Sequence, residues 1–498
     1  MRARFAASVA VFLAVLAVFH GALDNGFLDW DDGLYVADNP QVQSFDLRWM
    51  LFNHRPQWGP LAYVSHAVDF ALFGLDPRGH HLSNLLLHAL AAVAVLHLFV
   101  AVARAAHAPW SEGSTLAGAS ATALLFAVHP LRVESVAWVA EKKDLLCALF
   151  FVLAILAHVR GARVLTHVAL GLALLAKAMA VSLPAVLLLL DFLLGRVTLA
   201  RLPRLLAEKT LLFAMAGAVA WITMHPPDWQ VRMRERSGEL TLTQQRLVVV
   251  RATAFYVERT LWPGRLVPFY PLPPPQELQW RQTAFLAAIA LAAALTAAAA
   301  VGLAFGSRAF PVAWLAYLVV LLPVSGIVPL SGQLASDRFS YLPTLGFFLL
   351  AGAVLAGARG RGRSLAWAVA GIAGIAWSAH SVAQVRIWRD SETFWRYVAD
   401  SFPGRVVMAH NNLGALYHRR AIESHDPAAL DRAEAEYRQA IAIFPRHANA
   451  WNNLGLVLEM RGDVTAALAC YDRALQIAPQ HPEATRNRAR LSARASGT

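Results

Sequence analysis

The sequence predicts an all-α protein, in which a polytopic bundle of membrane helices precedes a smaller helical domain. Two observations predict this fold class. Of the 498 residues, 57% are hydrophobic and only 15% are charged, which is typical of an integral membrane protein and excludes an ordinary soluble enzyme. The long apolar runs also stop near residue 382, after which Ala, Leu, Arg, Glu and Asn recur with helical spacing.

The apolar runs predict about 11 membrane spans. A hydrocarbon core of about 30 Å requires roughly 20 helical residues, and the longest runs approach that length. The predicted spans are 5–22, 82–104, 115–128, 145–160, 164–176, 179–195, 210–224, 283–306, 310–329, 341–357 and 364–382. The first run is long and lacks a clear cleavage site, so we expect a retained helix rather than a signal peptide.

Basic residues in the short linkers predict the orientation of the chain, because such residues favour the cytoplasmic side. The linkers on the same side as Arg2 and Arg4 contain Arg160, Arg163, Arg196, Arg201, Arg204, Lys209, Arg308, Arg359, Arg361 and Arg363. We therefore expect an inner (plasma) membrane protein with a cytoplasmic N-terminus and extracytoplasmic (periplasmic) residues after 382. The net charge of +12 then reflects topology, and no nucleic-acid partner is expected.

The membrane domain, residues 1–382, then has three external loops, at 23–81, 129–144 and 225–282. In the third loop, charged residues interrupt the apolar stretch from Leu247 to Trp262, which predicts an amphipathic surface helix. The prolines that follow predict an irregular segment.

The first external loop carries acids next to aromatic side chains. Its four acids within nine residues are Asp24, Asp29, Asp31 and Asp32. The pair Asp31 and Asp32 is expected to supply a general base at the membrane surface. The structural alternative is that both residues only cap the following helix.

The second external loop breaks the charge rule, because Arg132, Lys142 and Lys143 would lie on the external side. Three cations there favour a site that holds an anion. The alternative is a solvated loop in which neighbouring Glu and Lys residues pair with one another.

Residues 383–498 contain an internal repeat. Two units, at about 407–447 and 448–481, match the 34-residue tetratricopeptide pattern, and residues 482–495 are expected to form a capping helix. Asn411 and Asn412 of the first unit correspond to Asn452 and Asn453 of the second. We expect these asparagines to form a surface that binds an extended acceptor or partner, with consensus packing as the alternative.

Further motifs run through the chain in a characteristic order: Trp30–Tyr35, Asn39-Pro40, Arg55-Pro56, His81–Asn84 with His88, His129-Pro130, Glu134–Trp138, Glu141–Asp144, Leu175–Pro184, Asp191, Trp262-Pro263, Ser336–Pro343 and Trp388-Arg389. By these motifs the chain resembles bacterial relatives of the transmembrane and tetratricopeptide-repeat-containing protein O-mannosyltransferases. That family is part of the C-type glycosyltransferase superfamily.

The resemblance implies a polyprenyl-phosphate sugar donor, a protein or glycan acceptor, and an external active site. It implies Asp31 as the base, with Asp32 orienting it or contacting acceptor. It also implies that His129, Glu134 and Tyr35 bind acceptor or shape the loop. Only two clear repeats are present. The resemblance therefore does not decide whether the acceptor is a protein of the animal type.

Five cations are candidates for binding the donor phosphate: Arg338, Lys177, Lys142, Lys143 and Arg132. For Arg338 the alternative is an ion pair with Asp337, and for Lys177 it is extension of the side chain to the lipid headgroups.

No metal cofactor is expected, although an acidic pair does not exclude a divalent cation. His80, His81 and His88 are expected to pack between helices rather than to ligate a metal.

Two other functional classes remain as alternatives. One is a non-catalytic repeat scaffold anchored by its spans, which would not require Asp31, Lys177 or Arg338. The other is a transporter or flippase of a lipid-linked intermediate, which would place charges at the middle of the membrane rather than at one face.

Overall fold

The computed structural model describes residues 1–53, 58–225, 240–327 and 333–495. The chain forms two compact units. The membrane unit consists of Met1–Phe27 and Asp31–Trp388, and the repeat unit consists of Leu28–Trp30 and Arg389–Thr498. Arg55-Pro56, one of the motifs noted in the sequence, lies outside the described residues.

The all-α fold class is confirmed. The first third of the membrane unit contains α1 (Arg2–Phe19), η1 (His20–Asp24), η2 (Gly33–Ala37), α2 (Pro40–Gln43), α3 (Leu47–Phe52), α4 (Pro60–Phe73), α5 (Pro77–Ala105) and α6 (Glu112–Ala127). The next part contains η3 (Pro130–Arg132), α7 (Val133–Ala137), η4 (Val139–Glu141), α8 (Lys142–Val159), α9 (Arg163–Ala176), η5 (Ala178–Ser182), α10 (Leu183–Leu193) and α11 (Leu202–Met224).

The remainder of the membrane unit contains α13 (Leu242–Leu261), β1 (Tyr270–Pro271), η6 (Pro275–Glu277), α14 (Thr283–Ala304), α15 (Ala309–Leu321), η7 (Leu322–Val324), β2 (Gln333–Ala335), η8 (Asp337–Ser340), α16 (Leu345–Gly357), α17 (Gly360–Val385) and η9 (Arg386–Trp388). The short strands β1 and β2 pair antiparallel. The helix expected near Leu247–Trp262 is α13.

Each predicted span coincides with a helix of the membrane unit. Among the described residues, five helices are long and apolar enough to cross a membrane: α1 with η1, α5, α11, α14, and α17 with η9. The α6 helix and the η3–α7 segment form a further candidate that is bent by 59°. The shorter apolar helices are α9, η5–α10, α15–η7 and α16, and α8 begins with three charged residues. The protein is therefore a multi-pass membrane protein.

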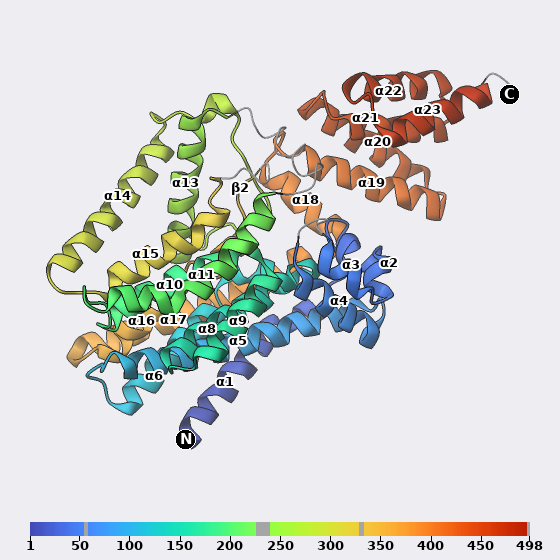
Figure 1. The fold of residues 1–498 in the computed structure, drawn as a ribbon. Helices are drawn as coiled ribbons and strands as arrows, with labels where there is room; N and C mark the ends of the chain where they lie inside the picture. Colours follow the sequence, from blue (N-terminus) through green and yellow to red (C-terminus); the bar gives the residue numbers. More distant parts are fainter. Residues whose placement is uncertain (54–57, 226–239, 328–332, 496–498) are drawn as a thin grey trace. The chain divides into compact units, whose positions relative to one another are not determined.

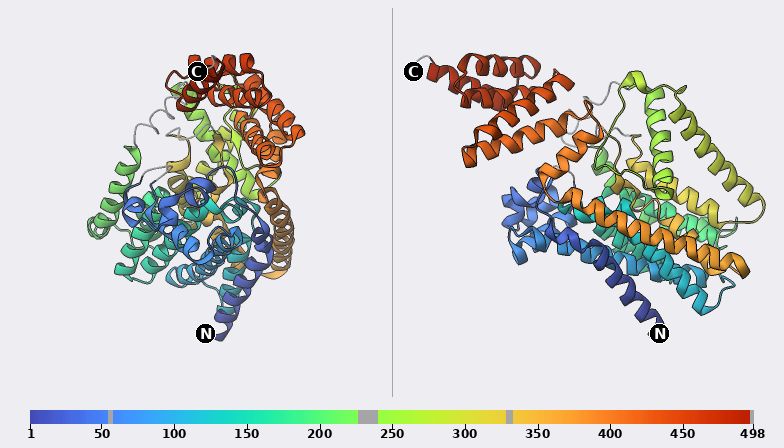
Figure 2. Two further views of the ribbon diagram at one scale, coloured as in Figure 1. Left: turned by 90° about the vertical axis from the view of Figure 1, so that its right-hand side faces the viewer. Right: turned by 180° about the vertical axis from the view of Figure 1, so that it is seen from behind.

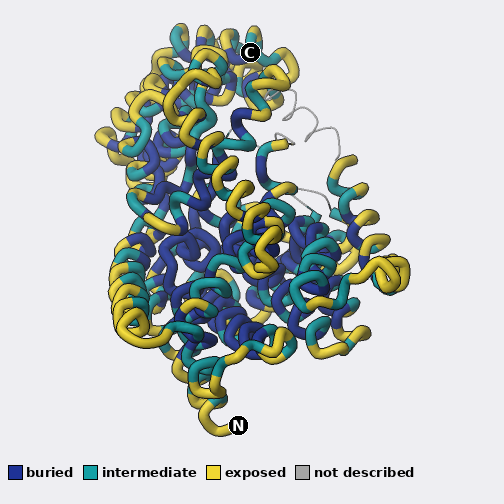
Figure 3. Tube along the Cα trace, turned by 90° about the vertical axis from the view of Figure 1, so that its left-hand side faces the viewer, coloured by how far each residue is buried: buried dark blue, intermediate teal, exposed yellow. Residues whose placement is uncertain are grey.

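Helix α5 packs against α1, α6 and α8 (Figure 1). In its most apolar window 61% of the residues are buried, against 6% for α17. Figure 3 shows buried segments inside the membrane unit and exposed segments around it. An exposed apolar stripe on α17, formed by Leu365, Val369 and Ile372, is what a helix in contact with lipid requires.

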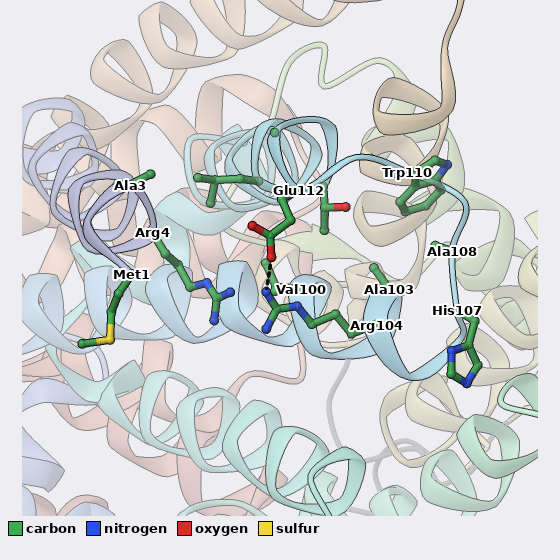
Figure 4. Close-up of a pocket in the computed structure, with 13 residues that line it drawn as sticks. Met1, Ala3, Arg4, Val100, Ala103, Arg104, His107, Ala108, Trp110 and Glu112 are labelled. Atoms are coloured by element: carbon green, nitrogen blue, oxygen red, sulfur yellow. Dashed lines mark hydrogen bonds and ion pairs between the residues drawn. The ribbon is translucent and has the colours of Figure 1, made fainter.

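A hollow of about 530 Å³ lies between the start of α1, the end of α5 and the start of α6 (Figure 4). Arg104 and Glu112 form an ion pair of 3.0 Å beside it. The residues that line this hollow include none of the predicted site residues.

The repeat unit consists of α18 (Ser391–Ser401), α19 (Val407–Ser424), α20 (Pro427–Ile443), α21 (Ala448–Met460), α22 (Val464–Ile477) and α23 (Pro482–Ala495), packed successively (Figure 2). A Cβ atom on Gly414 would lie 2.7 Å from the Tyr437 ring, and one on Gly455 would lie 2.6 Å from the Tyr471 ring. The helix pairs α19–α20 and α21–α22 therefore pack through the same contact between a glycine and a tyrosine ring, as the repeat pattern predicts.

Candidate active site

Asp31 and Asp32 precede η2, a single π-helical turn in the first loop, but their environments differ. The Asp32 side chain is fully buried, and its Oδ1 accepts a hydrogen bond of 2.8 Å from the backbone N–H of Ala140. This hydrogen bond links the first loop to η4, the turn that precedes α8. Helix capping, the alternative for both residues, is absent for Asp32, since its side chain does not cap η2.

Asp31 lies among charged side chains. Burial raises the pKa of its carboxyl group above the ordinary value of 3.8. The positive charge of Lys143 lowers this pKa, the negative charge of Glu141 raises it, and Arg338 lowers it. Asp31 is therefore a carboxylate whose proton affinity is increased by its surroundings, as a general base requires.

Arg338 is held by two glutamates from the second loop. Its guanidinium pairs with Glu134 through Nη1, while its backbone N–H donates to the other Glu134 oxygen over 2.9 Å. The Arg338 Nε atom lies 3.3 Å from Glu141 Oε1. The pairing with Asp337 that the sequence left open does not occur, because Asp337 accepts from the Tyr270 hydroxyl over 3.0 Å.

Two lysines approach the same acids. Lys143 Nζ lies 3.0 Å from Glu141 Oε1 and donates to the Ala140 carbonyl oxygen over 3.0 Å. Lys177 pairs with Asp144, and its Nζ lies 3.7 Å from Glu141 Oε2. The Lys177 side chain therefore points into the protein, and the alternative that it extends to the lipid headgroups is wrong.

These contacts, together with the electrostatic neighbours of Asp31, define the charge cluster: Asp31, Glu134, Glu141, Asp144, Lys143, Lys177 and Arg338. Glu141 is its centre, since it contacts all three cations. Burial by itself would raise the pKa of Glu141, but Lys143, Arg338 and Lys177 together lower that pKa to about 2. The three cations therefore favour the ionised form of Glu141.

The three cations also contact aromatic rings. Lys143 Nζ lies 4.4 Å from the centre of the Tyr35 ring. The Arg338 guanidinium lies 4.8 Å from the centre of the Phe339 ring, and Lys177 Nζ lies 5.4 Å from it. Contacts with aromatic rings and with carboxylates together fix the cations in position. Tyr35 and Glu134 are two of the three residues expected to bind acceptor or shape the loop. Tyr35 contacts Lys143, and Glu134 contacts Arg338.

The cations, Glu134, Glu141 and Asp144 are nearly inaccessible, with side chains no more than 11% exposed. Charges are costly to bury even in pairs, so an assembly of this kind is typical of functional sites. The second loop is accordingly neither solvated nor irregular, because η3, α7 and η4 fill it and all of its residues are buried.

Arg132 is occupied by contacts within the protein, which favour a structural role over binding of the donor phosphate. Its guanidinium donates to the Phe126 carbonyl oxygen over 3.2 Å, to Ser340 Oγ over 3.3 Å and to Thr344 Oγ1 over 2.7 Å. It also lies 4.5 Å from the centre of the Phe126 ring. These contacts use the guanidinium to join the end of α6 to the η8–α16 segment.

Lys142 and His129 contact other groups. The fully buried Lys142 pairs with Asp69, and His80 Nδ1 lies 3.7 Å from the same carboxylate oxygen. His129 caps η3 through Nδ1, and its Nε2 lies 3.1 Å from the Thr260 carbonyl oxygen. His129 therefore shapes the loop, one of the two roles the sequence left open for it.

The histidines of α5 make packing contacts. His80 Nε2 lies 3.0 Å from the Gly74 carbonyl oxygen, and His88 contacts the Tyr341 hydroxyl over 2.6 Å and the Ala127 carbonyl oxygen over 3.1 Å. Within the described parts of the chain, no group of three His, Cys, Asp or Glu side chains is arranged to hold a metal ion.

The paired asparagines form a line of amides across the repeats. Asn411 Nδ2 donates to Asn412 over 3.3 Å, Asn453 to Asn411 over 3.4 Å, and Asn452 to Asn453 over 3.1 Å. Asn487 of α23 extends the line by donating to Asn452 over 3.0 Å. These bonds stabilise the helix stack, as the packing alternative requires, and leave amide groups with further hydrogen-bonding capacity.

Comparisons with known proteins give matches to a family model, several relatives and a solved structure. A model of the tetratricopeptide repeat matches residues 430–482. The C-terminal region therefore contains tetratricopeptide repeats. The chain is also 30% identical over 177 residues to protein O-mannosyl-transferase TMTC4 of Homo sapiens, a match that covers 32% of this chain and 24% of the relative.

Two further relatives are also named as protein O-mannosyl-transferases. Protein O-mannosyl-transferase TMTC1 of Mus musculus is 28% identical over 170 residues, which cover 31% of this chain and 17% of the relative. Tmtc1 of Drosophila melanogaster is 34% identical over 132 residues, which cover 25% of this chain and 14% of the relative. The chain thus spans about a quarter or less of the length of the curated relatives that it matches.

A solved structure aligns with most of the chain. The crystal structure of ArnT from Cupriavidus metallidurans, bound to undecaprenyl phosphate, is matched over 96% of this chain and 87% of its own. The identity is 16% and the TM-score is 0.37, which is too low to transfer a ligand or an activity.

Proposed function

We propose that this protein is a C-type glycosyltransferase. It transfers a sugar, with mannose expected, from a polyprenyl-phosphate donor to a hydroxyl group of a protein or glycan outside the cytoplasm. The observation that carries the proposal is the charge cluster, which joins a carboxylate of raised pKa to three fixed cations from separate segments. The names of the relatives support transfer of a sugar to a hydroxyl group.

Asp31 is the general base of the proposed reaction. The acceptor oxygen forms a bond to the anomeric carbon of the sugar as the bond from that carbon to the phosphate oxygen breaks. The hydroxyl proton passes to the Asp31 carboxylate, and polyprenyl phosphate leaves with the electron pair of the broken bond. The raised pKa of Asp31 increases its affinity for that proton.

Lys143, Lys177 and Arg338 stabilise the charge on the departing phosphate. Their carboxylate partners hold them in place before the donor binds, so little reorganisation is needed during the reaction. The contacts of Arg338 with Glu134 and Glu141 engage Nη1 and Nε. Because a guanidinium offers five N–H donors, it retains capacity for a phosphate oxygen.

We propose that the reaction is independent of metal ions. The carboxylates of Glu134, Glu141 and Asp144, which could ligate a divalent cation, instead accept from arginine and lysine. Treatment with EDTA is therefore expected to leave the transfer rate unchanged, and a rate restored only by added Mg²⁺ or Mn²⁺ would contradict this point.

The repeat unit is proposed to hold the acceptor. The amide line of Asn411, Asn412, Asn452 and Asn453 offers the donors and acceptors that an extended peptide backbone recognises. Membrane lipid surrounds the spans and delivers the donor.

The proposal is tested with purified protein in lipid nanodiscs, supplied with labelled polyprenyl-phosphate mannose and a peptide acceptor. Asp31→Asn removes the base and is expected to lower kcat by about 10²- to 10⁴-fold, the usual contribution of general base catalysis. Asp32→Asn keeps an oxygen that accepts from Ala140 and is expected to retain most activity. Full activity of Asp31→Asn would remove this residue from catalysis.

Asp24→Asn is the matched control. Asp24 is an exposed acid of the same loop, and its ion pair with Arg78 at 3.4 Å is largely open to solvent. Such pairs contribute little to stability, so this variant is expected to behave like the wild type. Donors that carry other sugars, tested in parallel, identify the sugar.

A further inference from the structure

Three residues of the first loop are part of the repeat unit. Leu28–Trp30 group with Arg389–Thr498, whereas Asp31 and the rest of the loop group with the membrane unit. The division between the units thus falls at the peptide bond that joins Trp30 to Asp31.

Asp29 and Trp30 are held by side chains of α18 and α19. Arg419 of α19 pairs with the Asp29 carboxylate through both terminal nitrogens, with a distance of 3.1 Å for Nη1. The backbone N–H of Asp29 donates to Ser391 Oγ over 2.8 Å. The centre of the Trp30 ring lies 5.4 Å from that of Phe394 and 5.4 Å from that of Trp395.

These contacts differ in what they contribute. The Asp29 and Arg419 side chains are 41% and 52% exposed, so their attraction is weakened by water and mainly fixes orientation. Phe394 and Trp395 are fully buried, and packing with Trp30 supplies an apolar attachment.

The two residues that flank Asp31 in the sequence are held by different units. Trp30 is held by the repeat unit, and Asp32 is held by the backbone of Ala140. Because consecutive Cα atoms are only about 3.8 Å apart, a displacement of Trp30 moves the Asp31 carboxylate relative to Lys143 and Glu141.

We propose that the repeat unit positions the catalytic base, with Asp29, Trp30 and Arg419 as positioning residues for Asp31. The inference rests on the proposed function, because it assumes that Asp31 is the base. The repeats then contribute to catalysis itself as well as to the binding of an acceptor.

The test is a charge exchange in the full-length protein. Asp29→Arg and Arg419→Asp each place like charges together and are expected to lower kcat by up to about 10²-fold, the effect of a misplacement of about 1 Å. The KM for the donor should stay unchanged, because Lys143, Lys177 and Arg338 keep their contacts. The double variant restores the opposite charges and should recover most of kcat.

A pH profile separates positioning from a loss of folded protein. A smaller folded fraction scales the rate equally at every pH, whereas a displaced Asp31 also changes the midpoint of the acid limb of kcat/KM. Arg488→Asp is the control, since Arg488 forms a comparably exposed ion pair with Asp472 inside the repeat unit. It is expected to leave both kcat and the midpoint unchanged.

The outcomes distinguish this inference from the proposed function. A wild-type kcat and midpoint in Asp29→Arg, or no recovery in the double variant, overturns the positioning role. If Asp31→Asn is inactive while Asp29→Arg is unaffected, only the positioning role fails. If Asp31→Asn is fully active, the assignment of the base fails and the positioning role fails with it.

Discussion

At the scale of single residues, Asp31 and Asp32 show how two adjacent carboxylates acquire different roles. Asp32 is buried against a backbone N–H, and its oxygen serves as a fixed attachment point. Asp31 has cations and an acid as its electrostatic neighbours, and its pKa is raised. In the sequence the two residues are chemically identical neighbours, and only the resemblance to a known family favoured Asp31.

The neighbours of Asp31 predict a pH dependence. The proposed base, Asp31, can accept a proton only when it is ionised, so kcat/KM should rise with pH through a midpoint above the ordinary value of 3.8. Lys143→Met removes a positive charge that lowers the Asp31 pKa, so this midpoint should move to higher pH. Glu141→Gln removes a negative charge that raises the Asp31 pKa, so the midpoint should move to lower pH.

These shifts are measured from kcat/KM profiles at low donor concentration, which report groups in the free enzyme. The opposite signs form an internal control, because a general loss of stability would not move the two midpoints in different directions. Shifts of the same sign in both variants would show that Asp31 is not the titrating base.

At the scale of elements, the fold of segment 129–144 explains why its basic residues break the rule that such residues favour the cytoplasmic side. Its cations do not face the solvent, since Lys142 pairs with Asp69, Lys143 pairs with Glu141 and Arg132 bonds to neutral oxygens. The short helical turns η3, α7 and η4 fold these residues inward. A count of charges in loops records only their number and cannot distinguish a buried pair from an exposed one.

The crossing of α6 and α16 depends on two glycines, Gly118 and Gly352. A Cβ atom on Gly352 would lie 2.7 Å from the Gly118 carbonyl oxygen and would collide with Thr122 Oγ1. Gly352→Val should therefore destabilise the protein by about 1–3 kcal/mol, the usual cost of overpacking. Thermal unfolding in detergent measures this as a lower Tm.

Gly371→Ala provides the comparison for that variant. Gly371 lies within α17, and a Cβ atom there would meet nothing within 4 Å. Since alanine stabilises a helix interior by roughly 0.5–1 kcal/mol relative to glycine, its Tm should be equal to the wild type or higher. A Gly352→Val variant with the same Tm would mean that α6 and α16 do not cross closely.

At the scale of the whole molecule, the helices confirm a multi-pass protein, and its orientation remains a prediction. The pattern of basic linkers predicts that the repeat unit lies outside the cytoplasm. A periplasmic reporter enzyme fused after residue 383 should therefore be active, whereas the same reporter fused after residue 361, in a predicted cytoplasmic linker, should be silent. The reverse pattern would contradict both the orientation and an external active site.

The sequence by itself determined the helices that coincide with the eleven predicted spans and the repeats of the second unit. Both signals are local, since a span is a run of apolar residues and a repeat is a spacing of small and large ones. The tertiary structure alone decided that Glu141 is the centre of the charge cluster, that Arg132 lies outside it, and that Leu28–Trp30 are part of the repeat unit. These facts depend on pairs far apart in the chain, such as Glu141 with Arg338, Arg132 with Thr344 and Asp29 with Arg419, and no local pattern records such pairings.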